Sequence, residues 1–297
     1  MIIPKSLTEG STIAVVSPSS IIKPQNVYKA LPVLNDQGWK TVTGEHAFDR
    51  KGTFAGTPEV RYSDFAAALR DPEVNAILCS RGGYGAVYIL EQLNRLPLEK
   101  YPKWVIGYSD ISAIHALLTE RGIASIHAPM AKHIADYGAD DPDTASLFAI
   151  LRGEGVDYHF EPNPLNHDGE ASGLLVGGNL SVIADLIGTP YDVIKPGRIL
   201  FIEDVNEPLY KIDRMIWQIK LSGVLDELAG LIVGKFHGCA ADNDFSSASK
   251  LIANLVKDVD YPVAFDIPIG HVRHNVPLIC GMGATLTVTP EGVSLVQ

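Results

Sequence analysis

Short apolar runs alternate with amphipathic segments along the first half of the chain. Runs such as Thr12–Ser17 and Ala76–Cys79 have the length of buried strands, and Val27–Asp36 carries apolar residues at helical spacing. Thr57 followed by Pro58 indicates a helix start, because proline is tolerated at the first helical position. Such alternation predicts an α/β domain with a mostly parallel sheet flanked by helices. The expected strands are 12–17, 39–43, 76–79, 103–106 and 124–127, and the expected helices are 27–36, 58–69, 86–93, 110–119 and 143–151.

The periodicity fades after residue 153, where Gly, Pro, Asn and acidic residues accumulate up to residue 169. We therefore expect an N-terminal α/β domain over residues 1–153, a linker over 154–170 and a mixed α+β, barrel-like domain over 171–297. Pro290–Gly292, between two apolar runs, predicts a hairpin near the end of the chain. The expected strands are 173–176, 198–202, 230–233, 263–265, 285–289 and 293–296, and the expected helices are 180–187, 210–221 and 247–256.

Composition narrows the possible partners. The 297 residues include 24 Lys and Arg against 35 Asp and Glu, and the formal net charge is −11. This acidic balance argues against a nucleic-acid or anionic-membrane partner, since both attract basic patches. The three cysteines are far apart and form no CxxC, which argues against a disulfide framework and structural zinc. No signal-peptide pattern and no long apolar run occur, so we expect a cytoplasmic protein.

A serine lies where an expected strand runs directly into an expected helix, in Gly107–Asp110. Such a corner resembles a nucleophile elbow, in which the hydroxyl of Ser109 is exposed beside the positive end of a helix. The second glycine of the usual G-x-S-x-G pattern is missing. The alternative is that Ser109 or Asp110 only caps the helix.

The loop Arg81–Gly85 carries three glycines at the end of another expected strand. Amides without side chains can approach an anion or a developing oxyanion, although three glycines can also form only a tight turn. The pattern matches neither the dinucleotide nor the ATP fingerprint, and the loop at Ser17–Ser20 has no glycine. We therefore expect no nicotinamide or nucleotide cofactor.

A serine nucleophile needs a base, usually histidine, and an orienting carboxylate. Nine histidines compete for the first role. His271 and His274 share a loop at a spacing that could suggest a metal pair, but no third ligand is near, so we expect no metal site. For the carboxylate, Glu203 and Asp204 end an apolar run just before an expected helix. One acid near its N-terminus would satisfy the helix, so another is available for chemistry.

Six segments together resemble the LD-carboxypeptidase family of serine peptidases, which includes the microcin C self-immunity proteins. They occur in the family's order and span most of the chain. They are Ser80–Gly85, Gly107–Ser112, His127–Met130, Gly177–Leu180 with Gly188–Tyr191, Phe201–Asp204 with Tyr210–Arg214, and Ile269–His271.

The resemblance implies a catalytic triad. By position it places the nucleophile on Ser109, the acid on Glu203 and the base on His271. The chain order serine, glutamate, histidine is compatible with a triad but does not establish its geometry. Three further residues in or near the motifs are interpreted as packing or hydrogen-bonding residues: His115, His127 and Asn179.

The resemblance also implies how an oxyanion and a substrate carboxylate are bound. The oxyanion hole would use the main-chain amide of Asp110 and that of Gly82 or Gly83, between which the sequence does not decide. A carboxypeptidase must hold a free carboxylate, and Arg81 is the candidate because arginine can bind one in a bidentate manner. The alternative for Arg81 is a structural salt bridge.

The implied activity is release of terminal D-Ala from murein tetrapeptides in peptidoglycan recycling. The enzyme would be a cytoplasmic homodimer with a peptide or muropeptide substrate and no cofactor. One alternative is a microcin C-type peptidyl-nucleotide amide hydrolase. The chain lacks the long insertion in its second half that we associate with that branch. Another alternative is a non-catalytic module whose glycine loop holds an anion.

Overall fold

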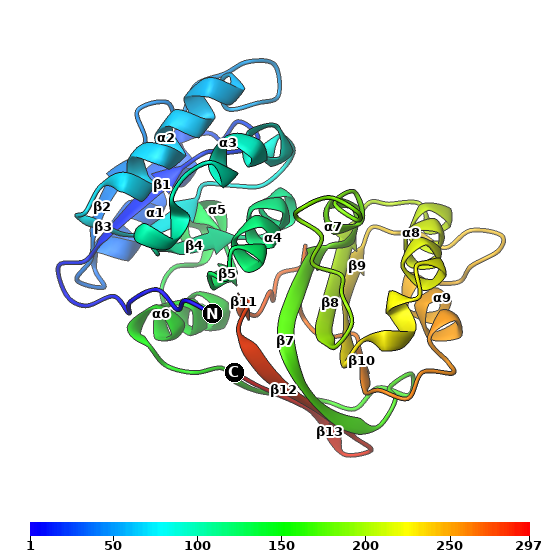
Figure 1. Cartoon of the computed structure of the whole chain (residues 1–297). Helices are drawn as coiled ribbons and strands as arrows, with labels where there is room; N and C mark the ends of the chain where they lie inside the picture. The colour runs from blue at the N-terminus through cyan, green and yellow to red at the C-terminus, as the bar shows by residue number, and fades with distance from the viewer. The chain divides into compact units, whose positions relative to one another are not determined.

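The computed structural model describes residues 1–297 and holds two sheets, each accompanied by helices (Figure 1). The contacts divide the chain into two compact units. Unit 1 comprises Met1–Glu154 and Val276–Ile279, and unit 2 comprises Gly155–Asn275 and Cys280–Gln297. Both units mix strands and helices, which confirms the predicted α/β fold class.

Unit 1 is built on a six-stranded sheet in the order β11-β5-β4-β3-β1-β2. Adjacent strands from β2 to β5 pair in parallel, as the alternation of strands and helices predicts. The central strands are almost wholly buried, which explains their continuous apolar runs. The strands are β1 (Thr12–Val16), β2 (Lys40–Thr43), β3 (Val74–Cys79), β4 (Trp104–Gly107), β5 (Ser125–His127) and β11 (Leu278–Cys280).

The helices of unit 1 begin close to the predicted positions. Pro58 opens α2 and Asp141 caps α6 by accepting a hydrogen bond from the Thr144 amide. Helix α5 was not predicted, because its seven residues are too few to show a helical period. The helices are α1 (Pro24–Asn35), α2 (Pro58–Arg70), α3 (Leu90–Asn94), α4 (Ser112–Glu120), α5 (Ala131–Tyr137) and α6 (Pro142–Arg152), with 3₁₀ turns η1 (Ala86–Ile89), η2 (Leu98–Lys100) and η3 (Ser109–Ile111).

Unit 2 holds a seven-stranded sheet in the order β10-β9-β8-β7-β12-β13-β6. Strands β7 to β10 pair in parallel, while β12, β13 and β6 add antiparallel pairs. The predicted hairpin is confirmed, since Thr289 pairs with Gly292 across the turn. Strands β10 and β6 do not pair with each other, so no closed barrel forms, although an antiparallel bridge between His167 and Val263 ties β10 to the segment that follows β6. The strands are β6 (Asp157–Phe160), β7 (Gly169–Asn179), β8 (Arg198–Val205), β9 (Gly230–His237), β10 (Val263–Phe265), β12 (Gly283–Thr289) and β13 (Gly292–Val296).

The stretch expected to be an irregular linker, 154–170, contains a strand. Strand β6 pairs with β13, and β7 already begins at Gly169. Exposed and half-buried positions alternate along β6, which is typical of a sheet edge. Because Asp157 and His159 are polar, the segment contains no apolar run, and the sequence pattern did not predict this strand.

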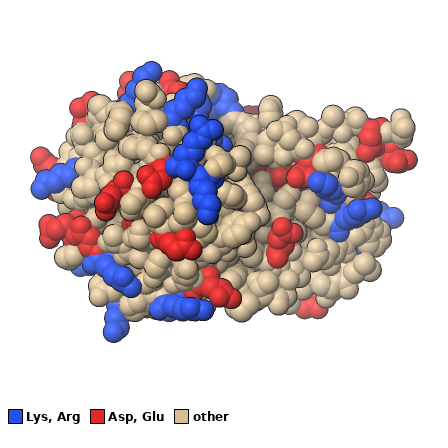
Figure 2. Space-filling view, turned by 90° about the horizontal axis from the view of Figure 1, so that it is seen from above, with Lys and Arg blue, Asp and Glu red and all other residues tan.

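Three helices accompany the second sheet: α7 (Leu180–Ala184), α8 (Leu209–Leu221) and α9 (Ala248–Leu255), with a 3₁₀ turn η4 (Val224–Glu227) before β9. Asn179 caps α7 and Ser247 caps α9 through their side-chain oxygens. None of the helices in the chain combines the length and the apolar character that crossing a membrane requires. Figure 2 shows acidic and basic side chains interspersed on one face, with wide areas that carry neither.

Candidate active site

Ser109 occupies a strained turn between β4 and the helix that follows. Its backbone φ is 66°, a left-handed conformation that costs a residue with a Cβ atom free energy. Neither η3 nor α4 begins with a side-chain capping bond. The N-cap positions are occupied by Tyr108 and Ile111 rather than by Ser109. The strain at Ser109 is typical of a nucleophile elbow.

The side chain of Asp110 does not cap the helix either. Its Oδ2 atom accepts hydrogen bonds from Ser19 Oγ at 2.5 Å and from the Ala86 amide at 2.8 Å. Burial raises the pKa of Asp110, while these two hydrogen bonds and the charge of Arg61 oppose that shift. The main-chain N–H of Asp110 lies in the first turn of the helix, where amides have no intrahelical acceptor.

The glycine loop packs directly against the elbow. A Cβ atom on Gly82 would lie 2.8 Å from Ser109 Cβ and 3.0 Å from Ser109 Oγ, so this approach requires glycine. Gly83 has a φ of 114°, another conformation that suits glycine. Ser20 fixes the loop, since its Oγ accepts a hydrogen bond from the Tyr84 amide at 3.0 Å. The structure thus brings the loop predicted to bind an oxyanion beside Ser109.

Arg81 lies exposed at the start of this loop. Its Nε donates to the Gly82 carbonyl at 3.2 Å and its Nη1 donates to the Ile21 carbonyl at 3.1 Å. No carboxylate forms an ion pair with Arg81, so the salt-bridge interpretation is wrong. The guanidinium group is a solvent-exposed cation beside the glycine loop.

His115 forms a hydrogen bond with the last residue of β4. Its Nε2 donates to the Gly107 carbonyl at 2.8 Å, and its Nδ1 lies 2.8 Å from Ser125 Oγ. Because a carbonyl can only accept, Nδ1 of the neutral ring accepts the Ser125 proton. Complete burial lowers the pKa of His115 to about 4. His115 is thus a neutral hydrogen-bonding residue, as interpreted from the sequence.

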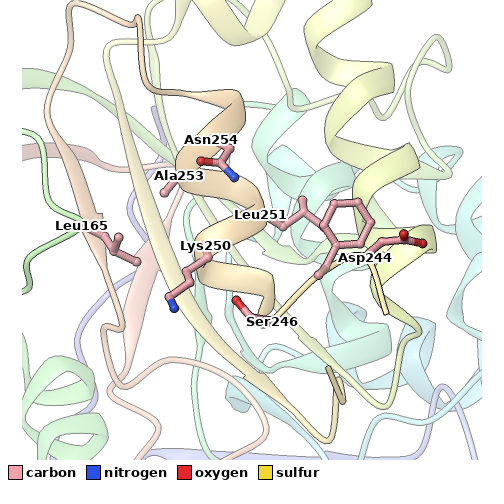
Figure 3. Close-up of a pocket in the computed structure, with 8 residues that line it drawn as sticks. Leu165, Asp244, Ser246, Lys250, Leu251, Ala253 and Asn254 are labelled. Atoms are coloured by element: carbon pink, nitrogen blue, oxygen red, sulfur yellow. The ribbon is translucent and has the colours of Figure 1, made fainter. Parts of the chain in front are cut away.

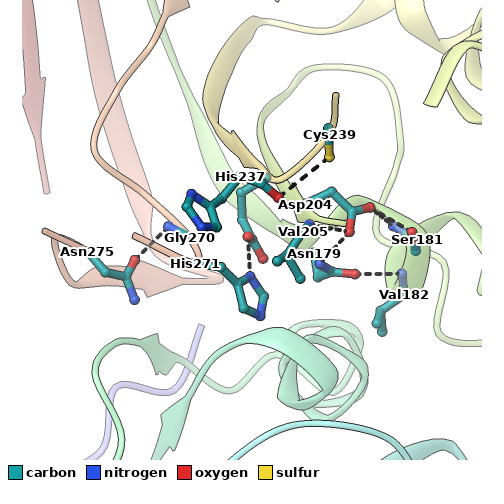
Figure 4. A network of polar contacts seen from close by, with 11 residues as sticks. Asn179, Ser181, Val182, Asp204, Val205, His237, Cys239, Gly270, His271 and Asn275 are labelled. Carbon is teal, nitrogen blue, oxygen red and sulfur yellow. Dashed lines mark hydrogen bonds and ion pairs between the residues drawn. The ribbon is translucent and has the colours of Figure 1, made fainter. Parts of the chain in front are cut away.

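In unit 2, Glu203 and His271 form a direct pair. The carboxylate of Glu203, 0% exposed, lies with its Oε2 2.8 Å from His271 Nδ1 (Figure 4). Because a carboxylate only accepts, Nδ1 carries the proton and Nε2 is the basic atom of the neutral ring. Gly270 permits this approach, since a Cβ atom there would lie 2.7 Å from Glu203 Cβ.

The neighbouring acid, Asp204, forms hydrogen bonds with different partners. It accepts hydrogen bonds from Asn179 Nδ2 at 3.0 Å, from the Ser181 amide at 2.9 Å and from Ser181 Oγ at 2.6 Å (Figure 4). A further bond from the Val205 amide measures 2.8 Å. Asp204 thus ties β8 to the start of α7, while Glu203 faces the histidine. Asn179 is a hydrogen-bonding residue, as interpreted.

One cluster of possible metal ligands was not predicted. The ligand atoms of His133, Asp141 and Asp143 lie within 4.8 Å of one another. Asp141 also serves the helix: its Oδ2 accepts from the Thr144 amide at 3.1 Å and lies 2.7 Å from His133 Nε2. The hydrogen bonds of a capping residue account for this arrangement. His271 and His274 are not among its members.

Two hollows lie on unit 2, and no predicted site residue lines either of them. One, of about 340 Å³, runs along α9, with Lys250 and Leu251 in its wall (Figure 3). The other, of about 400 Å³, includes Lys235 and Asp266, whose charged groups pair at 2.6 Å. Neither includes Glu203 or His271.

The fold and these side chains define a class of protein. A serine on a strained strand-to-helix turn, a glycine loop beside it, and a histidine oriented by a buried carboxylate are the components of serine hydrolases. The comparisons with known proteins point to a carboxypeptidase. Residues 13–128 match the LD-carboxypeptidase N-terminal domain and residues 172–286 match the LD-carboxypeptidase C-terminal domain.

A full-length relative supports the same family. The probable murein peptide carboxypeptidase of Bacillus subtilis (strain 168) is 33% identical over 302 residues, which cover 99% of this chain and 94% of that protein. The chain therefore belongs to the LD-carboxypeptidase family, and it is a carboxypeptidase of the hydrolase class. This confirms the family predicted from the six segments.

Solved structures share the fold over the whole chain. Muramoyltetrapeptide carboxypeptidase from Oxalobacter formigenes superposes with a TM-score of 0.85 at 26% identity, covering 96% of this chain and 98% of that one. The microcin C7 self-immunity protein MccF superposes with a TM-score of 0.85 at 20% identity, covering 99% and 98%. The second likeness shows a common fold only.

Proposed function

We propose that the protein is a serine LD-carboxypeptidase that releases the terminal D-Ala from murein tetrapeptides in peptidoglycan recycling. The observation that carries the proposal is the left-handed backbone of Ser109, because such strain is kept where function needs it. The Glu203–His271 hydrogen bond of 2.8 Å supports it independently. The names of the relatives from Bacillus subtilis and Oxalobacter formigenes support the substrate class.

In the proposed mechanism, His271 Nε2 takes the proton of Ser109 Oγ while the hydroxyl attacks the carbonyl carbon before D-Ala. Glu203 keeps the imidazole in the required tautomer and stabilises the imidazolium ion. His271 then protonates the leaving amine, and D-Ala departs from the acyl-enzyme. Water, with His271 as base, attacks the acyl-enzyme and regenerates Ser109.

The oxyanion would be bound by main-chain amides. The Asp110 N–H and the N–H of Gly82 or Gly83 are the proposed donors, each contributing about 3 kcal/mol in the transition state. The contact between Gly82 and Ser109 supports this assignment, since it holds the glycine loop at the reacting hydroxyl.

The free carboxylate of D-Ala would bind Arg81. Arginine offers two parallel N–H donors to a carboxylate. Support comes from the exposure of Arg81 and from its bonds to carbonyl oxygens alone, which leave its positive charge without an acidic partner.

We also propose a division of labour between two domains. Residues 1–153 would supply the nucleophile and the oxyanion hole, and residues 171–297 would supply the acid and the base. The enzyme would act as a cytoplasmic homodimer without a cofactor or metal. The resemblance to the family supports these assignments, and gel filtration with light scattering measures the oligomeric state.

Mass spectrometry of products from purified protein and murein tetrapeptide tests the proposal. Wild type should release D-Ala, and Ser109→Ala should reduce the rate by about 10⁶-fold, because triad members act as a unit. Ser63→Ala, an exposed serine on α2, is the control and should retain full activity. Substantial turnover by Ser109→Ala would contradict the proposed nucleophile.

The same assay separates the alternatives. A peptidyl-nucleotide amide is offered beside the tetrapeptide, and faster cleavage of the nucleotide compound would favour the microcin-type activity. An activated fluorophosphonate should label Ser109 of the wild type covalently. Absence of labelling would favour a non-catalytic binding module.

A further inference from the structure

Arg61 is a buried cation beneath the glycine loop. It lies on α2 and is only 2% exposed. Its Nη1 donates to the Pro18 carbonyl at 2.5 Å and to the Gly85 carbonyl at 2.7 Å. These two carbonyls belong to different loops: the 17–20 loop, which follows β1, and the glycine loop, which follows β3. A single nitrogen atom therefore joins the two loops.

Asp110 joins the same two loops through its carboxylate. Its Oδ2 accepts from Ser19 Oγ, in the 17–20 loop, and from the Ala86 amide, directly after the glycine loop. Arg61 and Asp110 form no direct ion pair, although the charge of each favours the ionised form of the other. Two buried charges of opposite sign thus each bond to both loops, and one of them is the neighbour of Ser109.

The shape of the glycine loop depends on this arrangement. Gly85 has a φ of 129°, and a Cβ atom there would lie 2.7 Å from Arg61 Nη1 and 2.9 Å from Phe54 Cδ1. The Arg61 guanidinium carbon lies 5.3 Å from the centroid of the Phe54 ring. The loop backbone therefore rests on the guanidinium group, with no side chain between them.

Burying two charges costs free energy, and a buried ion pair is weak support for stability in itself. A lone arginine on the buried face of a helix could have been an apolar residue if packing were the only requirement. The guanidinium group of Arg61 and the carboxylate of Asp110 instead form their hydrogen bonds with the loops beside the elbow. The two charges are therefore buried, at a cost in free energy, at the place where the main-chain geometry has to be accurate.

We infer that Arg61 is a positioning residue that, with the Asp110 carboxylate, clamps the 17–20 loop and the glycine loop together and so aims the amides of the glycine loop at Ser109. The inference rests on the proposed function, which gives the glycine loop its oxyanion-binding role. Arg61 touches neither the nucleophile nor the substrate in this account. It acts through the Gly85 and Pro18 carbonyls.

The test compares three variants with the wild type. Arg61→Met removes both hydrogen bonds and the charge, while Arg61→Lys keeps the charge and several N–H donors on one atom, as a single nitrogen atom makes both bonds in the wild type. Arg70→Met removes an exposed arginine from the same helix and is the matched control. The readouts are the rate of Ser109 labelling by a fluorophosphonate, and kcat and KM for tetrapeptide.

Arg61→Met should label Ser109 about 10²-fold more slowly and lose kcat by a similar factor with little change in KM, as displaced catalytic groups do. Arg61→Lys should recover most of the rate, and Arg70→Met should match the wild type. A folded Arg61→Met that labels at the wild-type rate would overturn the inference. A loss that Arg61→Lys does not recover would also count against it.

A milder variant covers the case in which Arg61→Met does not fold. Ser19→Ala removes only the bond from the 17–20 loop to Asp110 and should slow labelling about tenfold. Unchanged labelling of Ser19→Ala would overturn the clamp. Labelling without D-Ala release would refute the proposed substrate and leave the clamp standing, whereas a wild type that is not labelled would refute the nucleophile and the clamp with it.

Discussion

The turn at Ser109 in unit 1 and the Glu203–His271 pair in unit 2 are organised in different ways. Ser109 is held by main-chain geometry: a φ of 66° and contact with the backbone of Gly82. His271 is held by a side-chain bond of 2.8 Å to a carboxylate that is wholly buried. The elbow therefore depends on shape, and the pair depends on charge and tautomer.

This difference predicts different sensitivities. Added volume should damage the elbow even where no charge changes, because the glycine loop lies against Ser109. A change of charge without a change of volume should damage the pair, because Glu203 orients the ring through a single bond.

The largest effect is expected at the base. His271→Ala should lower kcat by about 10⁶-fold, because loss of the base disables the whole proposed triad. Steady-state release of D-Ala measures this. His159→Ala on the edge strand β6 is the control and should remain fully active. Activity of His271→Ala within tenfold of the wild type would show that another group is the base.

The two adjacent acids should behave in opposite ways. Glu203→Gln keeps the volume but removes the charge, and kcat should fall about 10⁴-fold because the ring loses its orienting carboxylate. Asp204→Asn should instead lower the free energy of unfolding by about 1–3 kcal/mol, because four hydrogen bonds to Asp204 are disturbed.

Kinetics and thermal unfolding of both variants check this pair of predictions. A stable, inactive Asp204→Asn protein would mean that Asp204, rather than Glu203, has the catalytic role. A fully active Glu203→Gln protein would remove the glutamate from the mechanism.

Gly82→Ala should break the elbow by volume alone. The new methyl group would lie 2.8 Å from Ser109 Cβ, so the loop or the serine has to move, and kcat should fall about 10²-fold. Gly283→Ala is the matched control, since no heavy atom lies within 4 Å of its new Cβ atom. If both variants keep wild-type kcat, the glycine loop has no part in catalysis.

The smallest effect concerns stability and pH. The pKa of His115 is about 4 in the folded protein, against an ordinary value of 6.5. The unfolded chain therefore binds more protons between these pH values, and stability falls as the pH drops through that window. At pH 5 the loss from this residue should be about 2 kcal/mol.

Urea unfolding at pH 7 and pH 5 measures this loss. His115→Gln keeps an N–H donor for the Gly107 carbonyl but cannot take up the proton, so its stability should change less between the two pH values. An equal pH dependence in both proteins would show that other groups govern the acid sensitivity of unit 1.

Local sequence determined much of the fold. The apolar runs of β1, β3, β4 and β10 identified buried strands, and Pro58 placed the start of α2. Short or polar elements were not predicted from the sequence: α5 has seven residues, β11 has three, and β6 alternates half-buried with exposed positions at a sheet edge. Their stability comes from neighbours distant in sequence, so propensity and periodicity within each segment carry little signal.

How far the sheet of unit 2 closes is another result of tertiary structure. Whether β10 and β6 meet depends on the twist and order of seven strands, which no single segment encodes. The sequence therefore predicted the mixed second domain, and only the structure shows that its sheet stops short of a closed barrel.

Within the site, sequence patterns located Ser109, the glycine loop and the two adjacent acids, because corners, glycines and acids at strand ends are local features. The local pattern alone did not distinguish Glu203 from Asp204, and the family resemblance assigned the acid to Glu203. In the structure the two acids meet different neighbours, since successive side chains of a strand face opposite ways. Arg61 was missed for the same reason. On a helix it resembles any solvent-exposed arginine, and its burial depends on Pro18 and Gly85, which are brought to it by two other loops.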